Sequence, residues 1–457
     1  MRSLAALLVF LLTAAGAAPA LAQHAFAWEA HEQGAAAGLL QLTIFHSDVI
    51  NTGTLSSTYR VAMAVTAPPV WVTSMCEGDF CYAPFVREFE FTLAPGDTND
   101  IGANITPVTN LGGCLATLTV TCLDDPALVQ TRSFTVVTPG LDVLIVDADD
   151  SADPVPWTAA ALGALGKSSV AWTAAAVGSP TTEILAHYDT VIWSTGFTVS
   201  GLDEAARTAL TGYVQQGGHL WLNGANLAFS QCSPASPAYS PASLAWVRDV
   251  VGADWIAFSA NSTVVNGVPG DELGDGLAVT LGGGDSAANN TSPDVLAANG
   301  GIACLAYGTG TTAAVRRAWG AGRIVLTAFT LEGVQSAAQR TDLAAAVLGW
   351  YAGGASAVGD LPAARLQAPR ATPNPFNPRT VLSFGLAGTA AQPVSITVHD
   401  ARGRLVRRLL QASLEPGPQA VAWDGRDDSG RALAAGVYLA RISAGEASAA
   451  LKMTLAK

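Results

Sequence analysis

The 457-residue sequence has little charge, and positive charge is especially scarce. Charged residues make up 13% of the chain, and Lys and Arg together number 23 against 36 Asp and Glu. A nucleic-acid-binding surface needs clustered cations to neutralise phosphates, so this composition argues against nucleic acid as a partner. Half of the residues are hydrophobic, so the chain can bury large cores and wholesale disorder is not expected.

The sequence also lacks an apolar run of the roughly 20 residues that a membrane-spanning helix requires. Its leading apolar segment, residues 4–12, follows Arg2 and precedes the small residues Ala20 and Ala22. This order of features predicts a signal peptide over residues 1–22. We therefore expect an exported protein with no transmembrane segment in the mature chain.

Cysteine is scarce, and neither a catalytic constellation nor the compact ligand spacing of a zinc site can be recognised in the sequence. The six cysteines are an even number, which permits disulfides in an exported protein. Cys76 and Cys81 flank a short loop and are predicted to form a bridge. Cys114 and Cys122 frame one predicted strand and would lie about 26 Å apart when extended, too far to pair with each other.

Hydrophobic periodicity divides the chain into three blocks. In residues 23–138, apolar residues such as Phe89 and Phe91 alternate with polar ones between turn signals, which predicts an all-β, immunoglobulin-like (Ig-like) sandwich. Residues 141–352 alternate strand-like and helix-like runs, which predict an α/β domain with a mostly parallel sheet of the flavodoxin type. Residues 353–372 are interpreted as a linker, and residues 373–457 as a second, small all-β Ig-like sandwich.

An acidic loop follows the first predicted strand of the α/β domain and contains Asp147, Asp149 and Asp150. Ligands gather at the carboxyl ends of strands in an open parallel sheet, and clustered carboxylates suit a hard cation such as Ca²⁺ or Mg²⁺. The loop lacks the glycine and the terminal Glu of an EF-hand, so a solvated loop stays the alternative. No other cofactor is indicated.

The last block carries the most specific motif residues: Asn374, Pro375, Phe376, Asn377, Pro378, Trp423, Asp424, Gly425, Gly436 and Tyr438. With them, residues 373–457 resemble the C-terminal sorting domain of type IX secretion substrates and the Ig-like domain of the flagellar hook-capping protein. The resemblance implies export across the outer membrane of a Gram-negative bacterium, to the cell surface or the medium. It also implies the secretion and sorting machinery of that membrane as the partner.

The middle block resembles the class I glutamine-amidotransferase-like fold in residues 143–147, 188–193 and 216–222. Active members of that family present a cysteine nucleophile in a Gly-x-Cys-x-Gly elbow. The matching stretch here begins at Gly224 and has Asn226 at the nucleophile position. Because an amide cannot attack as a thiolate does, the resemblance implies a non-catalytic module with a structural or ligand-binding role.

Two other functions stay open. A hydrolase or amidotransferase would use Cys232, with His219 as the nearest candidate base, or an unrecognised carboxylate pair. A surface adhesin would use the sandwich domains to bind glycans or proteins. A disulfide between Cys232 and Cys304 is a further alternative, in which Cys232 would have no free thiol for catalysis.

Charge is divided unevenly along the chain. Residues 23–365 contain 11 basic and 30 acidic residues, whereas residues 366–457 contain 11 basic and 6 acidic residues. The net charges are therefore −19 and +5. The basic tail is interpreted as a solvated face of scattered arginines, with attraction to an anionic surface such as lipopolysaccharide as the alternative.

Overall fold

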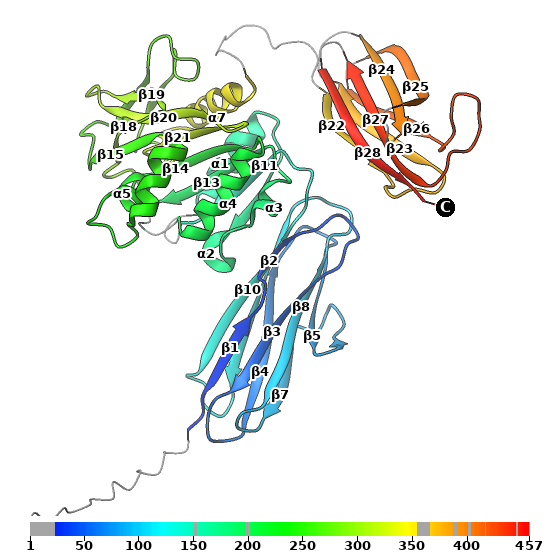
Figure 1. Ribbon diagram of the computed structural model, residues 1–457. Helices are drawn as coiled ribbons and strands as arrows, with labels where there is room; N and C mark the ends of the chain where they lie inside the picture. Colours follow the sequence, from blue (N-terminus) through cyan, green and yellow to red (C-terminus); the bar gives the residue numbers. More distant parts are fainter. Residues whose placement is uncertain are drawn as a thin grey trace, which may run out of the picture. The chain divides into compact units, whose positions relative to one another are not determined.

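The computed structural model describes residues 23–149, 153–197, 199, 202–353, 366–386, 391–400, 404–415, 417–444 and 447–456. The predicted signal peptide lies outside the described residues. The chain forms two compact units that divide at residue 356, each with its own hydrophobic cores (Figure 1). Among the described residues, no helix combines the length and apolar character needed to cross a membrane.

The first unit begins with a β-sandwich, as predicted. One sheet has the strand order β1 (Phe26–Ala30), β3 (Thr43–Asn51), β8 (Thr98–Thr106), β5 (Val72–Glu77), β6 (Phe80–Cys81). The other has the order β2 (Gly34–Ala36), β10 (Val129–Val137), β9 (Gly113–Cys122), β4 (Ser57–Thr66), β7 (Glu88–Leu93). Alternate residues of these strands enter a common core, which includes the thiols of Cys114 and Cys122.

Cysteine pairing in the structure follows the prediction for the sandwich. Cys76 and Cys81 face each other across the β5–β6 pair and form a disulfide. Cys114 and Cys122 are both buried free thiols. The alternative bridge between Cys232 and Cys304 is wrong, because both are also free and buried.

The rest of the first unit is built on a mixed sheet of eleven strands within the described residues. Its parallel half has the order β12 (Ser169–Thr173), β11 (Val143–Asp147), β13 (Thr190–Gly196), β14 (His219–Gly224), β21 (Gly322–Thr327). Antiparallel pairing extends it through β20 (Thr312–Trp319), β19 (Ile302–Tyr307), β16 (Val264–Gly267) and β17 (Ala278–Thr280). Two further strands, β15 (Ala253–Ala257) and β18 (Val295–Ala298), pair with each other, and β18 also pairs with β20.

Helices cover both faces of this sheet (Figure 1). On one face, α1 (Val155–Ala164) and α7 (Ala337–Tyr351) share a core with inward residues of β11, such as Ile145. On the other face, α4 (Glu204–Gln215) packs with residues such as Val146. The remaining short helices are α2 (Ala174–Val177), α3 (Thr182–Leu185), α5 (Leu227–Cys232), α6 (Pro241–Trp246) and the π-helical turn η1 (Val247–Val251).

The prediction of an α/β, flavodoxin-like domain with a parallel sheet is wrong. Of the described residues, 46% are in strands and 16% in helices, and about half of the strands in this sheet pair antiparallel. Residues 253–319 contribute short strands joined by loops, where a parallel sheet would need helical crossovers. Strand periodicity marks strands but does not show the direction of their partners, so this difference could not be detected in the sequence.

The sandwich and the mixed sheet pack together within the first unit. Val137, the last residue of β10, belongs to one of the cores of the mixed sheet. The ring of Trp172 lies against Gly34, where an added Cβ would come within 2.1 Å of it. Tyr188 is buried and its hydroxyl donates a 3.0 Å hydrogen bond to the carbonyl of Thr138. These contacts make the two domains one folded body.

The second unit is a smaller β-sandwich. One sheet has the order β22 (Leu366–Thr372), β23 (Thr380–Leu386), β26 (Gly417–Trp423), and the other β25 (Leu405–Leu414), β24 (Gln392–Asp400), β27 (Gly436–Ala444), β28 (Ala447–Leu455). The linker prediction over residues 353–372 extends too far, because β22 occupies residues 366–372 and pairs with β23. Pairing with β23 therefore places residues 366–372 in a strand, although their Pro-containing composition indicated a linker.

Removing the Tyr188 hydroxyl tests whether the first unit is one folded body. Tyr188→Phe leaves the Thr138 carbonyl without its donor, and we expect the first unit to lose about 1–2 kcal/mol of unfolding free energy. Tyr438→Phe is the matched control, because Tyr438 donates to the carbonyl of Ala434 within the second unit. Differential scanning calorimetry should show each substitution shifting only its own unit. A Tyr188→Phe variant that leaves the first transition in place would contradict this packing.

Candidate functional site

A row of polar side chains crosses the parallel half of the mixed sheet. Asp147, Ser194, Asn223 and Thr327 are consecutive register partners on β11, β13, β14 and β21. Register partners in parallel strands point to the same face, and Trp221, two residues before Asn223, places that face on the α1/α7 side. The hydroxyl of Ser194 donates to the Asn223 Oδ1 at 3.0 Å. The carboxyl ends of these strands therefore carry a buried polar edge.

Carboxylates gather at this edge. Asp147, Asp149 and Glu332 are 7%, 6% and 0% exposed. Burial raises the pKa of Asp147 to about 7, and the negative charges of Asp153, Asp149 and Glu332 act in the same direction. Burial also raises the pKa of Glu332, and Asp149 adds to this effect. Among the described residues, no Lys or Arg forms an ion pair with Asp147 or Glu332.

Hydrogen bonds hold these carboxylates only in part. The Asp149 amide donates to Asp147 Oδ1 at 3.1 Å, which fixes the turn after β11. Asn289 donates to Glu332 Oε1 at 2.7 Å, and the Thr330 side chain also interacts with this buried carboxylate. The carboxylate of Asp149 occupies the space where a Cβ on Gly196 would lie, only 1.7 Å from Oδ2. A glycine is thus required at position 196 for this arrangement.

The structure brings together only two of the three residues predicted to bind a metal ion, Asp147, Asp149 and Asp150. Asp147 and Asp149 are neighbours at the edge, with Glu332 as a third carboxylate that the sequence did not indicate. Asp150 lies outside the described residues. Within the part of the chain that is described, these carboxylates do not form a group whose ligand atoms all lie within 4.8 Å of one another. Calcium binding here stays a prediction.

The stretch from Gly224 to Asn226 follows β14. Asn226 is the residue before helix α5, and its side-chain amide donates to the carbonyl of Phe197 at 3.0 Å. It is 6% exposed. The side chain therefore connects two loops. Because the prediction of a parallel-sheet, amidotransferase-like domain is wrong, the interpretation of this stretch as a degenerate nucleophile elbow has no support.

The alternative nucleophile Cys232 is not paired with a base. His219 begins β14, whereas Cys232 ends the helix that follows the opposite end of that strand. The His219 ring stacks on Tyr351, with centroids 5.0 Å apart. Burial raises the pKa of Cys232 to about 11, and burial also raises the pKa of Cys304 far above its usual value. Neither thiol has the environment of an activated nucleophile.

The aromatic motif residues of the second unit form the centre of its core. Trp423 is fully buried, and its ring contacts Phe376 at 5.2 Å and Tyr438 at 5.4 Å between centroids. The Tyr438 hydroxyl donates to the carbonyl of Ala434 at 2.8 Å. The motif residues Phe376, Trp423 and Tyr438 are therefore determinants of the fold and are not accessible to a partner.

The polar motif residues connect the opening segment to the last strand. Asn374 donates to the carbonyl of Lys452 and accepts from the amide of Thr454, both at 2.8 Å. Phe376 makes an isolated parallel bridge with Leu455 of β28. Pro375, Asn377 and Pro378 belong to the same segment, and Gly436 begins β27. The opening motif thus closes the sandwich against its C-terminal strand.

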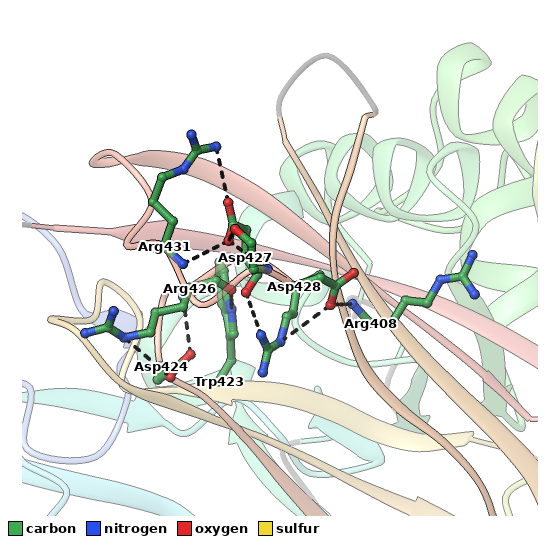
Figure 2. Close-up of polar contacts among 9 residues, drawn as sticks. Arg408, Trp423, Asp424, Arg426, Asp427, Asp428 and Arg431 are labelled. Carbon is green, nitrogen blue, oxygen red and sulfur yellow. Dashed lines mark hydrogen bonds and ion pairs between the residues drawn. The ribbon is translucent and has the colours of Figure 1, made fainter.

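Arg and Asp side chains stabilise the turn after Trp423 (Figure 2). The Trp423 Nε1 donates to the carbonyl of Arg426 at 3.0 Å, and the Arg426 amide donates to Asp424 Oδ1 at 3.2 Å. Asp427 accepts from the Arg431 amide and pairs with its guanidinium at 3.2 Å. Gly425 has φ +69°, and a Cβ there would lie 3.1 Å from the Pro378 carbonyl. This position therefore favours glycine.

The outer face of the larger C-terminal sheet is basic. Arg408 and Arg441 flank Thr397 in register from β25 and β27, and both are exposed. Lys452 on β28 is exposed and pairs with Leu439. The described acidic residues of this unit lie at strand ends and turns: Asp400, Glu415, Asp424, Asp427 and Asp428. The sheet thus presents cations without acidic neighbours in the same rows.

Comparison with known proteins identifies a family for part of the second unit. The model of the FlgD Ig-like domain matches residues 376–448. This confirms the predicted likeness to the Ig-like domain of the flagellar hook-capping protein, and the comparisons give no sign of an amidotransferase-like domain or of a dedicated sorting domain. No curated protein matches the sequence.

A comparison with solved structures finds partial matches. FlgD from P. aeruginosa is 26% identical over 17% of this chain and 59% of its own, with a TM-score of 0.14. PorZ, a surface component of the type IX secretion system of Porphyromonas gingivalis, is 20% identical over 20% of this chain and 12% of its own (TM-score 0.15). The exo-β-1,4-mannosidase Op5Man5 from Opitutaceae bacterium strain TAV5 is 14% identical over 48% of this chain (TM-score 0.31).

These structural matches are partial. The chain spans 36% of the mannosidase and 12% of PorZ. TM-scores this low do not support the transfer of an activity to this chain. The sequence match of residues 376–448 to the FlgD Ig-like domain is independent of these structures.

The buried thiols predict slow alkylation of the native protein. With a pKa of about 11, Cys232 should be a thiolate in on the order of one molecule in a thousand or fewer at pH 7.5. We expect iodoacetamide to modify neither Cys232 nor Cys304 under native conditions, and to modify both after unfolding in guanidinium, as peptide mass spectrometry would show. Rapid native labelling of Cys232 would support the hydrolase alternative.

The raised pKa of Asp147 predicts a pH dependence of stability. Between its ordinary value of 3.8 and about 7, the folded state keeps a proton that the unfolded chain has lost. The free energy of unfolding therefore falls as the pH rises through this window. Asp147→Asn should flatten that fall, and at pH 8 it should make the first unit more stable than the wild type by about 1–3 kcal/mol.

Denaturant unfolding at pH 4, 6 and 8 measures this effect. Asp79→Asn is the matched control, because Asp79 is an exposed carboxyl in the same unit. Equal pH profiles for Asp147→Asn and the wild type would show that burial does not raise the pKa of this carboxyl.

Proposed function

We propose that this chain is an exported, non-catalytic, multidomain protein of a Gram-negative bacterium, located at the cell surface or outside the cell. Its C-terminal Ig-like unit is the element by which outer-membrane secretion and sorting machinery recognises it. The remaining two domains form the delivered body, with a structural or ligand-binding role. The match of residues 376–448 to the FlgD Ig-like domain is the observation that carries this proposal.

The architecture of the second unit supports a recognition role. It is compact, has its own aromatic core and is separated from the first unit by the division at residue 356. Its net charge of +5 is opposite to the −19 of the body, so it can be attracted to a partner that the body repels. A module of this kind can be recognised whatever domains precede it.

The location of charge indicates which surface the machinery would contact. Most of the specific motif residues are buried or hold backbone groups, so their role is to build the sandwich. The exposed row of Arg408, Thr397 and Arg441 and the neighbouring Lys452 are available on its outer face. An acidic protein surface or an anionic glycolipid headgroup is the chemistry that such a face attracts.

Two features of the body support export and a non-catalytic role. The Cys76–Cys81 disulfide is typical of proteins that fold in an oxidising compartment outside the cytosol. The candidate nucleophile Cys232 is buried and lies away from His219, and Asn226 supplies only a structural hydrogen bond. Burial, with the negative charges nearby, raises the pKa of Asp147 and of Glu332, which suits a ligand or proton site more than a nucleophile.

Charge reversal on the outer face tests the recognition role in a host with a type IX secretion system. We expect the variant Arg408→Glu with Arg441→Glu to reach the cell surface several-fold less than the wild type and to accumulate in the periplasm. Arg379→Glu is the matched control, because Arg379 is exposed and precedes β23 of the other sheet. Immunodetection on intact cells and in periplasmic extracts measures both.

Two results would count against the proposal. A chain that ends at residue 356 and still reaches the surface at wild-type levels would show that the second unit is not needed. Normal delivery of the variant with both Arg408→Glu and Arg441→Glu, with circular dichroism confirming its fold, would show that the machinery does not recognise the outer face of this sheet.

A further inference from the structure

Three side chains with metal-binding atoms meet at one end of the N-terminal sandwich. They are His24, which precedes β1, Cys122, the last residue of β9, and Asp124, two residues further on. One ring nitrogen, the thiol sulfur and one carboxylate oxygen all lie within 4.8 Å of one another. Cys122 is fully buried, His24 is half-buried and Asp124 is exposed. The cluster therefore extends from a buried thiol to a carboxylate at the surface.

Three consecutive residues of β4 hold these side chains in place. The Ser57 hydroxyl lies 2.8 Å from the His24 Nδ1, and the Thr58 amide donates to Asp124 Oδ2 at 2.7 Å. Tyr59 is the register partner of Cys122 on the neighbouring strand. A regular strand places successive residues at fixed positions, so this segment fixes the positions of all three groups.

The hydrogen bonds leave lone pairs for a ligand. The Ser57 hydroxyl is also directed at the Leu55 carbonyl, so Ser57 can accept an Nδ1–H from His24. That tautomer keeps the lone pair on Nε2, and orientation of a metal-binding imidazole by such a second hydrogen bond is common. The Thr58 amide occupies one oxygen of Asp124, and no other described residue donates a hydrogen bond to its second oxygen.

Tyr59 lies beside the cluster as the register partner of Cys122. Its side chain is fully buried, and its hydroxyl interacts with the Ser57 side chain, which also contacts the His24 ring. Ser57 therefore links Tyr59 to His24 and helps to fix the position of the imidazole.

From this geometry we propose that His24, Cys122 and Asp124 form a zinc site. Imidazole nitrogen, thiolate sulfur and carboxylate oxygen are the three ligand types of protein-bound Zn²⁺, and three protein ligands with one open position is a known zinc geometry. The ion takes the proton-free thiolate, and the Cys122 proton leaves to solvent. Hard cations such as Ca²⁺ prefer sites made of oxygen ligands, so the sulfur selects against them.

The site joins the two sheets of the sandwich. His24 leads directly into β1 of one sheet, whereas Cys122 ends β9 of the other. Zinc binding therefore cross-links residues that are distant in the sequence. The Cys76–Cys81 disulfide, by contrast, cross-links the two strands of a local hairpin. A metal that binds only the folded sandwich stabilises it in proportion to its occupancy.

Cobalt substitution of the full chain, carrying no polyhistidine tag, tests the site. After chelator treatment and dialysis, we expect one equivalent of Co²⁺ to give a sulfur-to-cobalt charge-transfer band in the near ultraviolet, and Zn²⁺ to remove it by displacement. Elemental analysis should find one zinc per chain. Both metals should raise the melting temperature of the first unit, whereas Ca²⁺ should not.

Variants separate the proposed site from the other thiols. Cys122→Ser should abolish the charge-transfer band, and His24→Ala and Asp124→Asn should each weaken zinc binding by about 10–100-fold, the range known for loss of a metal-site contact. Cys114→Ser is the matched control, because Cys114 is the other buried free thiol of the sandwich. It should leave the band unchanged.

Either of two results would overturn the inference. One is the absence of a charge-transfer band and of a thermal shift in the wild type at equimolar metal. The other is a band that persists in Cys122→Ser or disappears in Cys114→Ser. If Cys122→Ser fails to fold, His24→Ala decides the question, because the half-buried His24 lies outside the strands and unchanged zinc affinity in that variant excludes the site.

Discussion

Burial of the Trp423 ring between Phe376 and Tyr438 is the contact on which the C-terminal unit depends. The three rings come from the opening segment, β26 and β27, so their packing joins both sheets and the first turn of the unit. Aromatic side chains of this size dominate the energetics of a small core. The basic outer face that we assign to recognition exists only because this core holds β25, β24 and β27 in register. The motif is thus a folding signature, and a partner would recognise the surface that the fold displays.

The first unit combines stable cores with polar groups buried at a cost. Three carboxylates share the edge of the mixed sheet, and no described cation pairs with Asp147 or Glu332. Burial favours the protonated forms of these two groups. Such an edge is where open sheets bind ligands, so a role of the body in ligand binding is consistent with its chemistry. The disulfide and the three-residue cluster at His24, Cys122 and Asp124 lie in the sandwich, and the disulfide suits a protein that folds outside the cytosol.

Local patterns predicted the parts of the structure that depend on neighbouring residues. The alternation through Phe89 and Phe91 matches β7. The spacing of Cys76 and Cys81 was sufficient because the hairpin between them closes locally. The same kind of pattern failed for the mixed sheet, since the hydrophobic runs at β19 and β20 resemble buried parallel strands but pair antiparallel. Asn226 likewise could be placed in a motif by spacing, but its hydrogen bond to Phe197 could not be foreseen.

The sequence alone therefore determined strands with regular alternation such as β7, which two cysteines pair and that the last block is Ig-like, because each follows from side chains within a few residues of one another. Tertiary structure alone decided the direction of strand pairing, the addition of Glu332 to the acidic edge and the meeting of His24 with Cys122 and Asp124. These features depend on the register between distant strands. Register is set by how two faces fit together in the folded core, and no local pattern of residues contains that information.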